Sequence, residues 1–336
     1  MAVKWTNKHN LPEQFKNALL VDEHVSLGDI SVTQLIDAPQ IRMLKKANSY
    51  EIDIMDLVGM AMGTGLHTIL ERGDMKGTFD SRALQRAAGI LRKYGEDKGA
   101  DYLHKIIKDN LKEIIDEDVI VEKTMTIEVL GWVVSGTMDR FIQSVKELND
   151  YKMTGASAVM FPEAKKLWDA QLNIYAEMLR ELGFEVDKAV IIAVLKDFSK
   201  MKILSNKDYP KTPVIQHEVK LIDRSVLKKY IEGRVRLHQR AEAGESIPCT
   251  KKDMWAKPDM YKVFINKGKR ALRTLLSKKE ADAYVESNGF RYPKPLEIKF
   301  KPSEPFRCAN GYCAVSEVCP QYAKEKELAA KDAEEM

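Results

Sequence analysis

The chain has 336 residues, with 54 Lys and Arg against 50 Asp and Glu and a formal net charge of +4. This length is ample for a large core in one or two domains, and the weak positive charge permits nucleic acid as a partner without demanding it. The chain contains no run of 18 or more apolar residues, so we expect no membrane-spanning helix and no membrane partner. Residues 1–17 are polar and lack the apolar centre of a secretory signal. We therefore expect a cytoplasmic protein, whose four cysteines are not a disulfide framework.

The first quarter of the chain is predicted to be mainly helical. Residues 1–30 are interpreted as a loosely packed lead-in, and a helix is predicted to begin in 31–40, where Ser31 or Thr33 can cap it. A second helix is predicted over about 54–72 and carries His67. The charged stretch 81–117 is also predicted to be helical, and His104 within it is expected to lie at the surface.

Two strands are predicted next, and they carry the most informative side chains. Residues 127–141 are rich in Val, Ile, Thr and aromatics, which favours a strand ending near Asp139. After a turn near 143–147, a second strand carries Asp150 and Lys152. Because strand side chains alternate between faces, these two point the same way. If the strands form a hairpin, Asp139 lies beside them.

A long helix is predicted over about 161–183. Its inner stripe at helical spacing consists of Leu167, Gln171, Ile174, Met178 and Leu182. Gln171 is the only polar member of this stripe, and Tyr175 lies one turn further on, next to it.

These residue types suit a divalent metal held against a phosphodiester. Mg²⁺ and Mn²⁺ prefer oxygen ligands, which Asp139 and Asp150 can supply, and such a metal lowers the pKa of a bound water. Lys152 can orient that water or stabilise developing charge, and the amide of Gln171 can position the lysine. Singly, an Asp-x-Lys pair is usually a solvated edge and a lone Gln is usually hydrogen-bonded core. The ordered set is far more informative.

The set Gly136-x-x-Asp139, Asp150-x-Lys152 and Gln171-x-x-x-Tyr175 resembles the RecB-type nuclease domain of the PD-(D/E)XK superfamily, over roughly residues 30–220. The resemblance implies that His67 and the carbonyl of Tyr151 join Asp139 and Asp150 as metal ligands. It also implies that Lys152 is catalytic, with Gln171 and Tyr175 supporting the lysine and the substrate. On its own, His67 would be interpreted as a core histidine.

The fold expected for residues 31–245 is an α/β core of the restriction-endonuclease type, a central mixed sheet flanked by helices. Residues 189–195 form a continuous apolar run, typical of a strand buried on both faces, and residues 213–221 alternate as another strand. His217 in that strand has no assigned role. A helix over 224–243 either contacts DNA phosphates or presents a solvated face. Its basic residues are Lys228, Lys229, Arg234, Arg236 and Arg240.

The cysteines predict a four-thiolate site in residues 246–322. They are Cys249, Cys308, Cys313 and Cys319. Such a set can hold zinc or an iron–sulfur cluster, but the paired Cys-x-x-Cys motifs of structural zinc are missing, and Cys319-Pro320 is typical of iron–sulfur sites. RecB-like relatives with three clustered carboxyl-terminal cysteines carry a [4Fe–4S] cluster, which the resemblance therefore implies, with zinc as the alternative. In those relatives the first ligand precedes a proline, where this chain has Ala38.

Between the cysteines lies a basic insertion, 255–300. Residues 261–275 are predicted to form a hairpin with its turn at Asn266-Lys267-Gly268, and residues 280–287 a short helix. Its aromatic residues Trp255, Tyr261 and Phe264 either stack on a single strand of nucleic acid or pack on one another. The tail 323–336 is charged and is expected to fray.

The leading hypothesis is a Mg²⁺- or Mn²⁺-dependent deoxyribonuclease. The resemblance implies an exonuclease acting on DNA ends or single strands in recombination, repair or phage replication, with recombination or replication proteins as possible partners. The stand-alone form is similar to phage-encoded nucleases, which would place it in the host cytoplasm. Two alternatives are a non-catalytic DNA-end-binding or adaptor protein on the same fold and a zinc-stabilised interaction protein.

Overall fold

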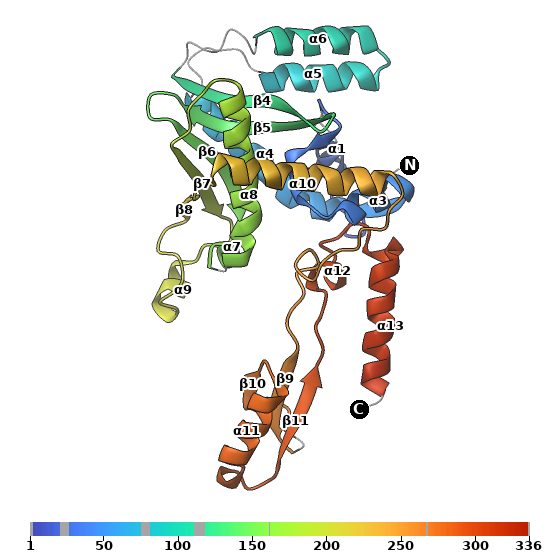
Figure 1. The fold of residues 1–336 in the computed structure, drawn as a ribbon, viewed down its shortest axis with the longest axis vertical. Helices are drawn as coiled ribbons and strands as arrows, with labels where there is room; N and C mark the ends of the chain where they lie inside the picture. The colour runs from blue at the N-terminus through green and yellow to red at the C-terminus, as the bar shows by residue number, and fades with distance from the viewer. Residues whose placement is uncertain are drawn as a thin grey trace. The chain divides into compact units, whose positions relative to one another are not determined.

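The computed structural model describes residues 3–20, 27–74, 81–110, 118–160, 162–266 and 268–334. The chain divides into two compact units, and the larger one comprises Trp5–Asp37 and Ile52–Ala243. The smaller unit comprises Met1–Lys4, Ala38–Glu51 and Gly244–Met336. Figure 1 labels most of the elements of both units. The end of the helix predicted over 81–117, the start of the helix predicted from 161 and the predicted turn residue Lys267 lie outside the described residues.

A mixed sheet forms the centre of the larger unit, as the sequence predicted. Its strand order is β2-β5-β6-β7-β8, and β4 pairs with β5. The β4–β5, β5–β6 and β7–β8 pairs are antiparallel, whereas β2–β5 and β6–β7 are parallel. The strands are β2 (Ile30–Ser31), β4 (Val119–Val129), β5 (Trp132–Ile142), β6 (Glu147–Thr154), β7 (Lys188–Leu195) and β8 (Val214–Glu218).

The single strand predicted over 127–141 is in fact the end of one strand and most of another. Leu130 and Gly131 both have positive φ angles, 52° and 77°, and form a two-residue turn between β4 and β5. Such a turn reverses the chain without splaying the strands, but it usually carries Asn-Gly or Asp-Gly. Leu130-Gly131 lacks that signal, and the segment of β4 before residue 127 was therefore not predicted.

Helices flank this sheet. Helix α8 packs on β4, β5, β6 and β7, and it lies in front of the sheet in Figure 1. Ile174 and Met178 of α8 are completely buried in the core, whereas Leu167 and Leu182, at the ends of the predicted stripe, are 39 % and 46 % exposed. The helices of this unit are α1 (Glu13–Leu19), α2 (Val32–Ile36), α4 (Val58–Asp74), α5 (Ser81–Lys93), α6 (Asp97–Asn110), α7 (Ala156–Met160), α8 (Pro162–Glu181), α9 (Lys200–Ser205) and α10 (Arg224–Glu242), with a 3₁₀ turn at Ile54–Leu57.

The helix predicted over 31–40 is interrupted. Ser31 caps α2 by accepting a hydrogen bond from the N–H of Gln34, as predicted, but α2 ends at Ile36 and a separate helix begins at Pro39. Proline disfavours a helical conformation in the residue before it, and its own missing N–H is tolerated at the first position of a helix. The break therefore follows from Ala38-Pro39.

The smaller unit contains a three-stranded antiparallel sheet of order β10-β9-β11. The antiparallel pair β9–β10 and the following helix were predicted, but β10 begins at Arg273 rather than directly after the predicted turn, and β11 was not predicted. The elements of this part are α3 (Pro39–Ala47), β9 (Met260–Ile265), β10 (Arg273–Leu275), α11 (Lys278–Asn288), β11 (Leu296–Lys301), α12 (Phe306–Ala309) and α13 (Pro320–Glu334), with 3₁₀ turns at Gly289–Arg291 and Ser316–Val318.

The lead-in is more ordered than expected, because β1 (Val3–Thr6) pairs with β3 (Tyr50–Asp53). Within the described ranges, no helix is long and apolar enough to cross a membrane.

Candidate active site

The site lies where β5 and β6 part. These strands pair only at Arg140↔Asn149, Phe141↔Leu148 and Ile142↔Glu147, so Asp139 and Asp150 are the next residues in register. There the Tyr151 N–H donates a hydrogen bond of 2.5 Å to Oδ2 of Asp139 instead of to a backbone carbonyl. The carboxylate thus satisfies a backbone donor that the diverging strands would leave without a partner.

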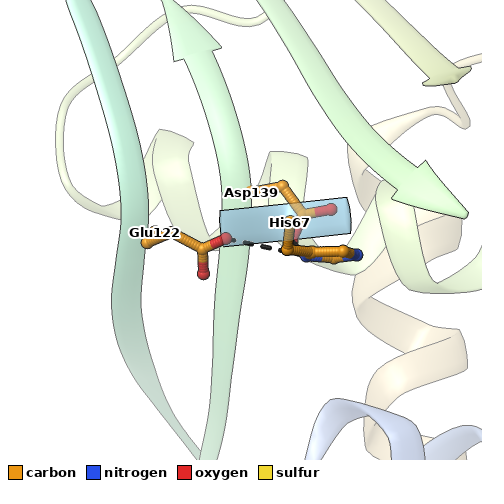
Figure 2. Close-up of side chains that lie close together, drawn as sticks. All are labelled: His67, Glu122 and Asp139. Carbon is orange, nitrogen blue, oxygen red and sulfur yellow. Dashed lines mark ion pairs between the residues drawn. The ribbon is translucent and has the colours of Figure 1, made fainter. Parts of the chain in front are cut away.

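Figure 2 shows three side chains that converge at this point. One ligand atom each from His67, Glu122 and Asp139 lies within 4.8 Å of the others. Nδ1 of His67 is 3.3 Å from Oδ1 of Asp139 and 3.6 Å from Oε1 of Glu122. The other ring nitrogen, Nε2, is 3.0 Å from the carbonyl oxygen of Tyr151. Glu122 was not among the residues predicted from the sequence.

The backbone of Glu122 is strained. Its φ angle is 48°, in the left-handed region that residues with a side chain seldom occupy. Residues held in such conformations cost roughly 1–3 kcal/mol and cluster at functional sites. The carboxylate it presents is almost completely buried, at 4 % exposure.

Burial and charge perturb the ionisation of this site. Burial disfavours the charged form of His67, but hydrogen bonds and charge from Asp139 and Glu122 outweigh it and raise the pKa of His67 to about 10. Burial raises the pKa of Asp150 to about 6, although the charge of Lys152 opposes that shift. His67 is therefore an imidazolium at neutral pH and supplies positive charge among buried carboxylates.

A chain of polar contacts leads away from Asp150. The Lys152 ammonium lies 2.7 Å from Oδ2 of Asp150 and donates a hydrogen bond of 3.1 Å to Oε1 of Gln171. Gln171 in turn donates through Nε2 to the hydroxyl of Tyr175, at 3.0 Å. These contacts fix which end of the Gln171 amide faces the lysine.

Tyr175 also explains the glycine of the Gly136-x-x-Asp139 motif. A Cβ atom at position 136 would lie 2.6 Å from Cε1 of Tyr175 and 2.9 Å from Cγ2 of Val32. Real Cβ atoms do not approach so closely, so only glycine permits α8 to bring Tyr175 against β5 here.

The donor set fits a hard divalent cation. Carboxylate oxygens with one imidazole and one backbone carbonyl suit Mg²⁺ or Mn²⁺. Oδ2 of Asp150 is completely buried and lies 2.7 Å from the Lys152 ammonium. The site therefore already holds one cationic group against a buried carboxylate.

A partly buried ion pair anchors the end of α4, the helix that carries His67. Arg140 donates through Nε and Nη2 to Asp74, at 2.7 and 3.1 Å, and through Nη1 to Oδ1 of Asn149, at 3.0 Å. Arg140 and Asn149 form the last pair before β5 and β6 diverge. These contacts, which form an Asp74–Arg140–Asn149 clamp, therefore hold the end of α4 against the sheet beside the site.

The sequence comparison identifies the family. The sequence profile of the PD-(D/E)XK nuclease superfamily matches residues 46–320. The chain belongs to this superfamily. No curated protein matches its sequence.

Two solved structures similar to this nuclease illustrate how far the likeness extends. The crystal structure of SSO0001 is 16 % identical, with a TM-score of 0.37, and the match covers 72 % of this chain and 88 % of that one. A phage-related exonuclease from Haemophilus somnus is 14 % identical, with a TM-score of 0.28, and the match covers 63 % of this chain and 92 % of that one.

The four cysteines of the nuclease line one pocket in its smaller unit. Cys249, Cys308, Cys313 and Cys319 surround it together with apolar side chains such as Met254 and Val315. Burial raises the pKa of Cys249 to about 12 and that of Cys308 to about 11. Ala38 belongs to the same apolar cluster as Cys313, and Cys249 packs against that cluster. Cys249 therefore lies in the neighbourhood of position 38, despite the distance along the sequence.

Gln40 connects two of these cysteines. Its Oε1 accepts a hydrogen bond from the Cys249 N–H at 3.0 Å, and its Nε2 donates to Sγ of Cys319 at 3.3 Å. Gln321 exchanges two further hydrogen bonds of 2.9 Å with the backbone of Cys249. The backbone of Cys249 is thus fixed from two sides.

Several other predicted residues have structural partners. In α10, Arg234 donates to the carbonyls of Leu35 and Asp37, and Lys228 pairs with Glu181 at 2.9 Å. His217 lies 2.9 Å from Asp169. His104 is half-buried rather than at the surface, because α5 packs against α6.

Two aromatic residues of the insertion, Trp255 and Tyr261, lie against other aromatic rings. The ring of Tyr261 lies 5.0 Å from that of Phe300, and the ring of Trp255 lies 5.4 Å from that of Tyr312. These two residues pack against aromatic neighbours, as one of the two alternatives predicted.

Proposed function

We propose that the chain is a metal-dependent DNA nuclease, an exonuclease that hydrolyses phosphodiester bonds at DNA ends or in single strands. The observation that carries the proposal is the convergence of His67, Glu122 and Asp139 beside the Lys152–Asp150 pair. A protein that only binds DNA has no need of buried acids around a histidine. Membership of the nuclease superfamily supports the same reaction class. The resemblance to RecB-type domains supports action on ends or single strands.

Each residue has a role that its contacts support. His67, Glu122, Asp139, Asp150 and the Tyr151 carbonyl would hold Mg²⁺ or Mn²⁺. When bound, such a cation lowers the pKa of a water and neutralises charge on the phosphate. Lys152 orients the attacking water and stabilises negative charge on the scissile phosphate. Gln171 and Tyr175 hold the Lys152 ammonium in place. Gln171 accepts a hydrogen bond from that ammonium, and Tyr175 accepts one from the Gln171 amide.

The cysteine pocket would hold a [4Fe–4S] cluster, with zinc as the alternative. Four thiols in one largely apolar pocket suit either group, and metal binding would hold them as thiolates despite the burial that raises the pKa values of Cys249 and Cys308. The role proposed for the cluster is structural, because it would join segments separated by more than fifty residues, Cys249 and Cys308.

Digestion of DNA tests the catalytic proposal. The purified chain is incubated with Mn²⁺ and either linear or covalently closed circular DNA, alongside Asp150→Ala. Asp169→Ala serves as the matched control, because the Asp169 carboxylate pairs with His217, which lies two strands away from Asp150 in the sheet. We expect linear DNA to be degraded, circular DNA to survive, and only Asp150→Ala to be inactive. Digestion of circular duplex would contradict exonuclease action. Binding of DNA ends without digestion would establish the non-catalytic adaptor instead.

Colour tests the cofactor proposal. An anaerobic preparation with an iron–sulfur cluster is brown and absorbs near ~400 nm, and its iron and sulfide can be quantified. A colourless preparation containing one zinc ion for each chain would establish the zinc alternative.

A further inference from the structure

The positive charge of the chain is concentrated in one small module. Residues 260–301, from β9 to β11, contain eleven Lys and Arg against four Asp and Glu, a net charge of +7. The whole chain has a net charge of only +4, so the rest of it is negative overall. The net charge of this module therefore favours contact with a polyanion.

The module has one covered face and one open face. Helix α11 packs on β9, β10 and β11, and the side chains Val263 and Ala281 between them are fully buried. Side chains alternate along a strand, so Lys262 and Phe264 point away from the face that carries Val263. Cross-strand pairing places Thr274 and Lys299 beside Lys262 on that open face. No other helix of the described residues packs substantially on these strands.

The open face contains a repulsive pair. Lys262 and Lys299 are directly opposite each other on β9 and β11. Like charges in such positions destabilise a sheet, and an anion between the two ammonium groups would relieve the repulsion. Lys299 is 56 % exposed and has a weak contact of 3.7 Å with Glu297. Lys262 forms no ion pair with any described residue, so its ammonium is available to a phosphate, and the 3.7 Å contact with Glu297 leaves that of Lys299 only weakly held.

An aromatic ring lies beside this pair. The Lys299 ammonium is 5.6 Å from the centre of the Phe264 ring, and Phe264 is partly exposed on the same face. Unlike Tyr261, which packs against Phe300, Phe264 has no aromatic ring against it among the ring contacts of the described residues. A ring flanked by lysines on an open sheet is the arrangement on which unpaired bases stack while the cations hold the backbone.

We propose that the open face of the β10-β9-β11 sheet binds single-stranded DNA, with bases on Phe264 and phosphates on Lys262 and Lys299. The choice of DNA rests on the proposed nuclease function, whereas the choice of a single strand rests on the exposed ring. Duplex DNA buries its bases and offers this face only phosphates. The module therefore holds an unpaired strand and supplies a second contact besides the catalytic site.

Binding of the full chain to fluorescein-labelled oligothymidine in EDTA tests the proposal, since without a divalent ion the strand is not digested. Phe264→Leu keeps an apolar side chain but removes the ring, and we expect about tenfold weaker binding with an unchanged salt dependence. Lys262→Ala and Lys299→Ala should each lower the slope of log affinity against log salt by about 0.7. Lys279→Ala, which removes the same charge from α11, is the matched control and should bind like wild type.

Thermal unfolding separates this role from a structural one. Because each lysine variant relieves the Lys262–Lys299 repulsion, its midpoint should equal or exceed that of wild type while binding weakens. A variant that binds weakly and also unfolds early would overturn the proposal. Equal weakening by Lys279→Ala, or tighter binding of duplex than of the single strand, would do the same, because either indicates attraction by charge alone.

The nuclease proposal and this one fail separately. Digestion abolished by Asp150→Ala, together with normal binding by Phe264→Leu, would sustain the nuclease and reject the binding face. Weak binding by Phe264→Leu in a chain that digests no DNA would sustain the face and reject the nuclease.

Discussion

Glu122 on β4 stands opposite Asp139 on β5, between the pairs Val121↔Arg140 and Lys123↔Met138. The two carboxylates share the same histidine, and His67 Nδ1 is 3.3 Å from Asp139 and 3.6 Å from Glu122. Glu122 accepts a left-handed backbone conformation at this position. Strain maintained at a buried acid indicates that the placement of its carboxylate matters to the site.

We therefore expect Glu122→Gln to weaken Mn²⁺ binding at least tenfold, because it removes one negative charge from the set while conserving size and the strained backbone. Calorimetric titration with Mn²⁺ measures the loss. Glu128→Gln is the matched control, since Glu128 lies on the same strand but is exposed. An affinity for Mn²⁺ equal to that of wild type in Glu122→Gln would remove Glu122 from the metal site.

Glu122 could not be predicted from the sequence, for a specific reason. Its position opposite Asp139 depends on the register of the β4–β5 pair, which is set by the turn at Leu130-Gly131. That turn lacks the residues that usually mark a tight hairpin, so the strands appeared continuous. Register is a property of two strands together, and the spacing along one strand contains no record of it.

Asp150 and Lys152 were easier to place, because two residues apart on one strand always share a face. The approach of α8 to β5 was visible only through family resemblance, although Gly136 marks it once the Tyr175 contact is known. Strand β11 was not predicted, although its alternating pattern, Leu-Glu-Ile-Lys-Phe-Lys, is typical of a strand. Its pairing with β9, and hence the lysine pair on the open face, required the structure.

The ionisation of His67 predicts how metal affinity depends on pH. A histidine that ligates a metal must be neutral, whereas the interactions of His67 with Asp139 and Glu122 raise its pKa to about 10. Metal binding at neutral pH therefore releases one proton, and affinity should rise about tenfold for each unit of pH below 10. Below about pH 6 the dependence should become steeper, since burial raises the pKa of Asp150 to about 6 and its proton must also leave.

Titration calorimetry with Mn²⁺ in two buffers of different ionisation enthalpy counts these protons. His67→Gln should bind metal more weakly and release no proton above pH 6. A wild-type heat of binding that is the same in both buffers would show that His67 keeps its proton and is not a ligand.

The contacts of Gln40 predict its effect on the proposed cluster. Gln40 is the residue that donates a hydrogen bond to Sγ of Cys319, at 3.3 Å, and it also fixes the Cys249 N–H. Hydrogen bonds from neighbouring side chains to ligand atoms typically change metal affinity by about 10–100-fold. We expect Gln40→Leu to lose iron to a chelator about tenfold faster than wild type, as followed by the decay of visible absorbance.

Gln321→Leu is the informative comparison, because the hydrogen bonds of Gln321 to Cys249 go to its backbone rather than to its sulfur. Gln321→Leu should lose iron to the chelator more slowly than Gln40→Leu does. Identical rates in both variants and in wild type would show that neither amide stabilises the cluster.

Two arginine–aspartate pairs of the larger unit differ in burial and should differ in their contribution to stability. Arg140 and Asp74 are 21 % and 22 % exposed and form two hydrogen bonds, whereas Arg92 and Asp101 are 42 % and 71 % exposed and form one of 3.1 Å. Asp74→Ala leaves the Arg140 charge partly buried, so we expect it to lower the free energy of unfolding by about 2 kcal/mol. Asp101→Ala should cost less than about 0.5 kcal/mol, because water already screens that pair.

Urea denaturation followed by circular dichroism measures both changes. Because Asp74 also anchors the end of α4, Asp74→Ala should weaken Mn²⁺ binding through the misplacement of His67, even where the chain remains folded. Arg140→Lys is the complementary variant, since lysine keeps the charge but cannot form the paired hydrogen bonds to Asp74 and the bond to Asn149 together. If Asp74→Ala and Asp101→Ala lose the same stability and bind Mn²⁺ like wild type, the clamp does not position α4.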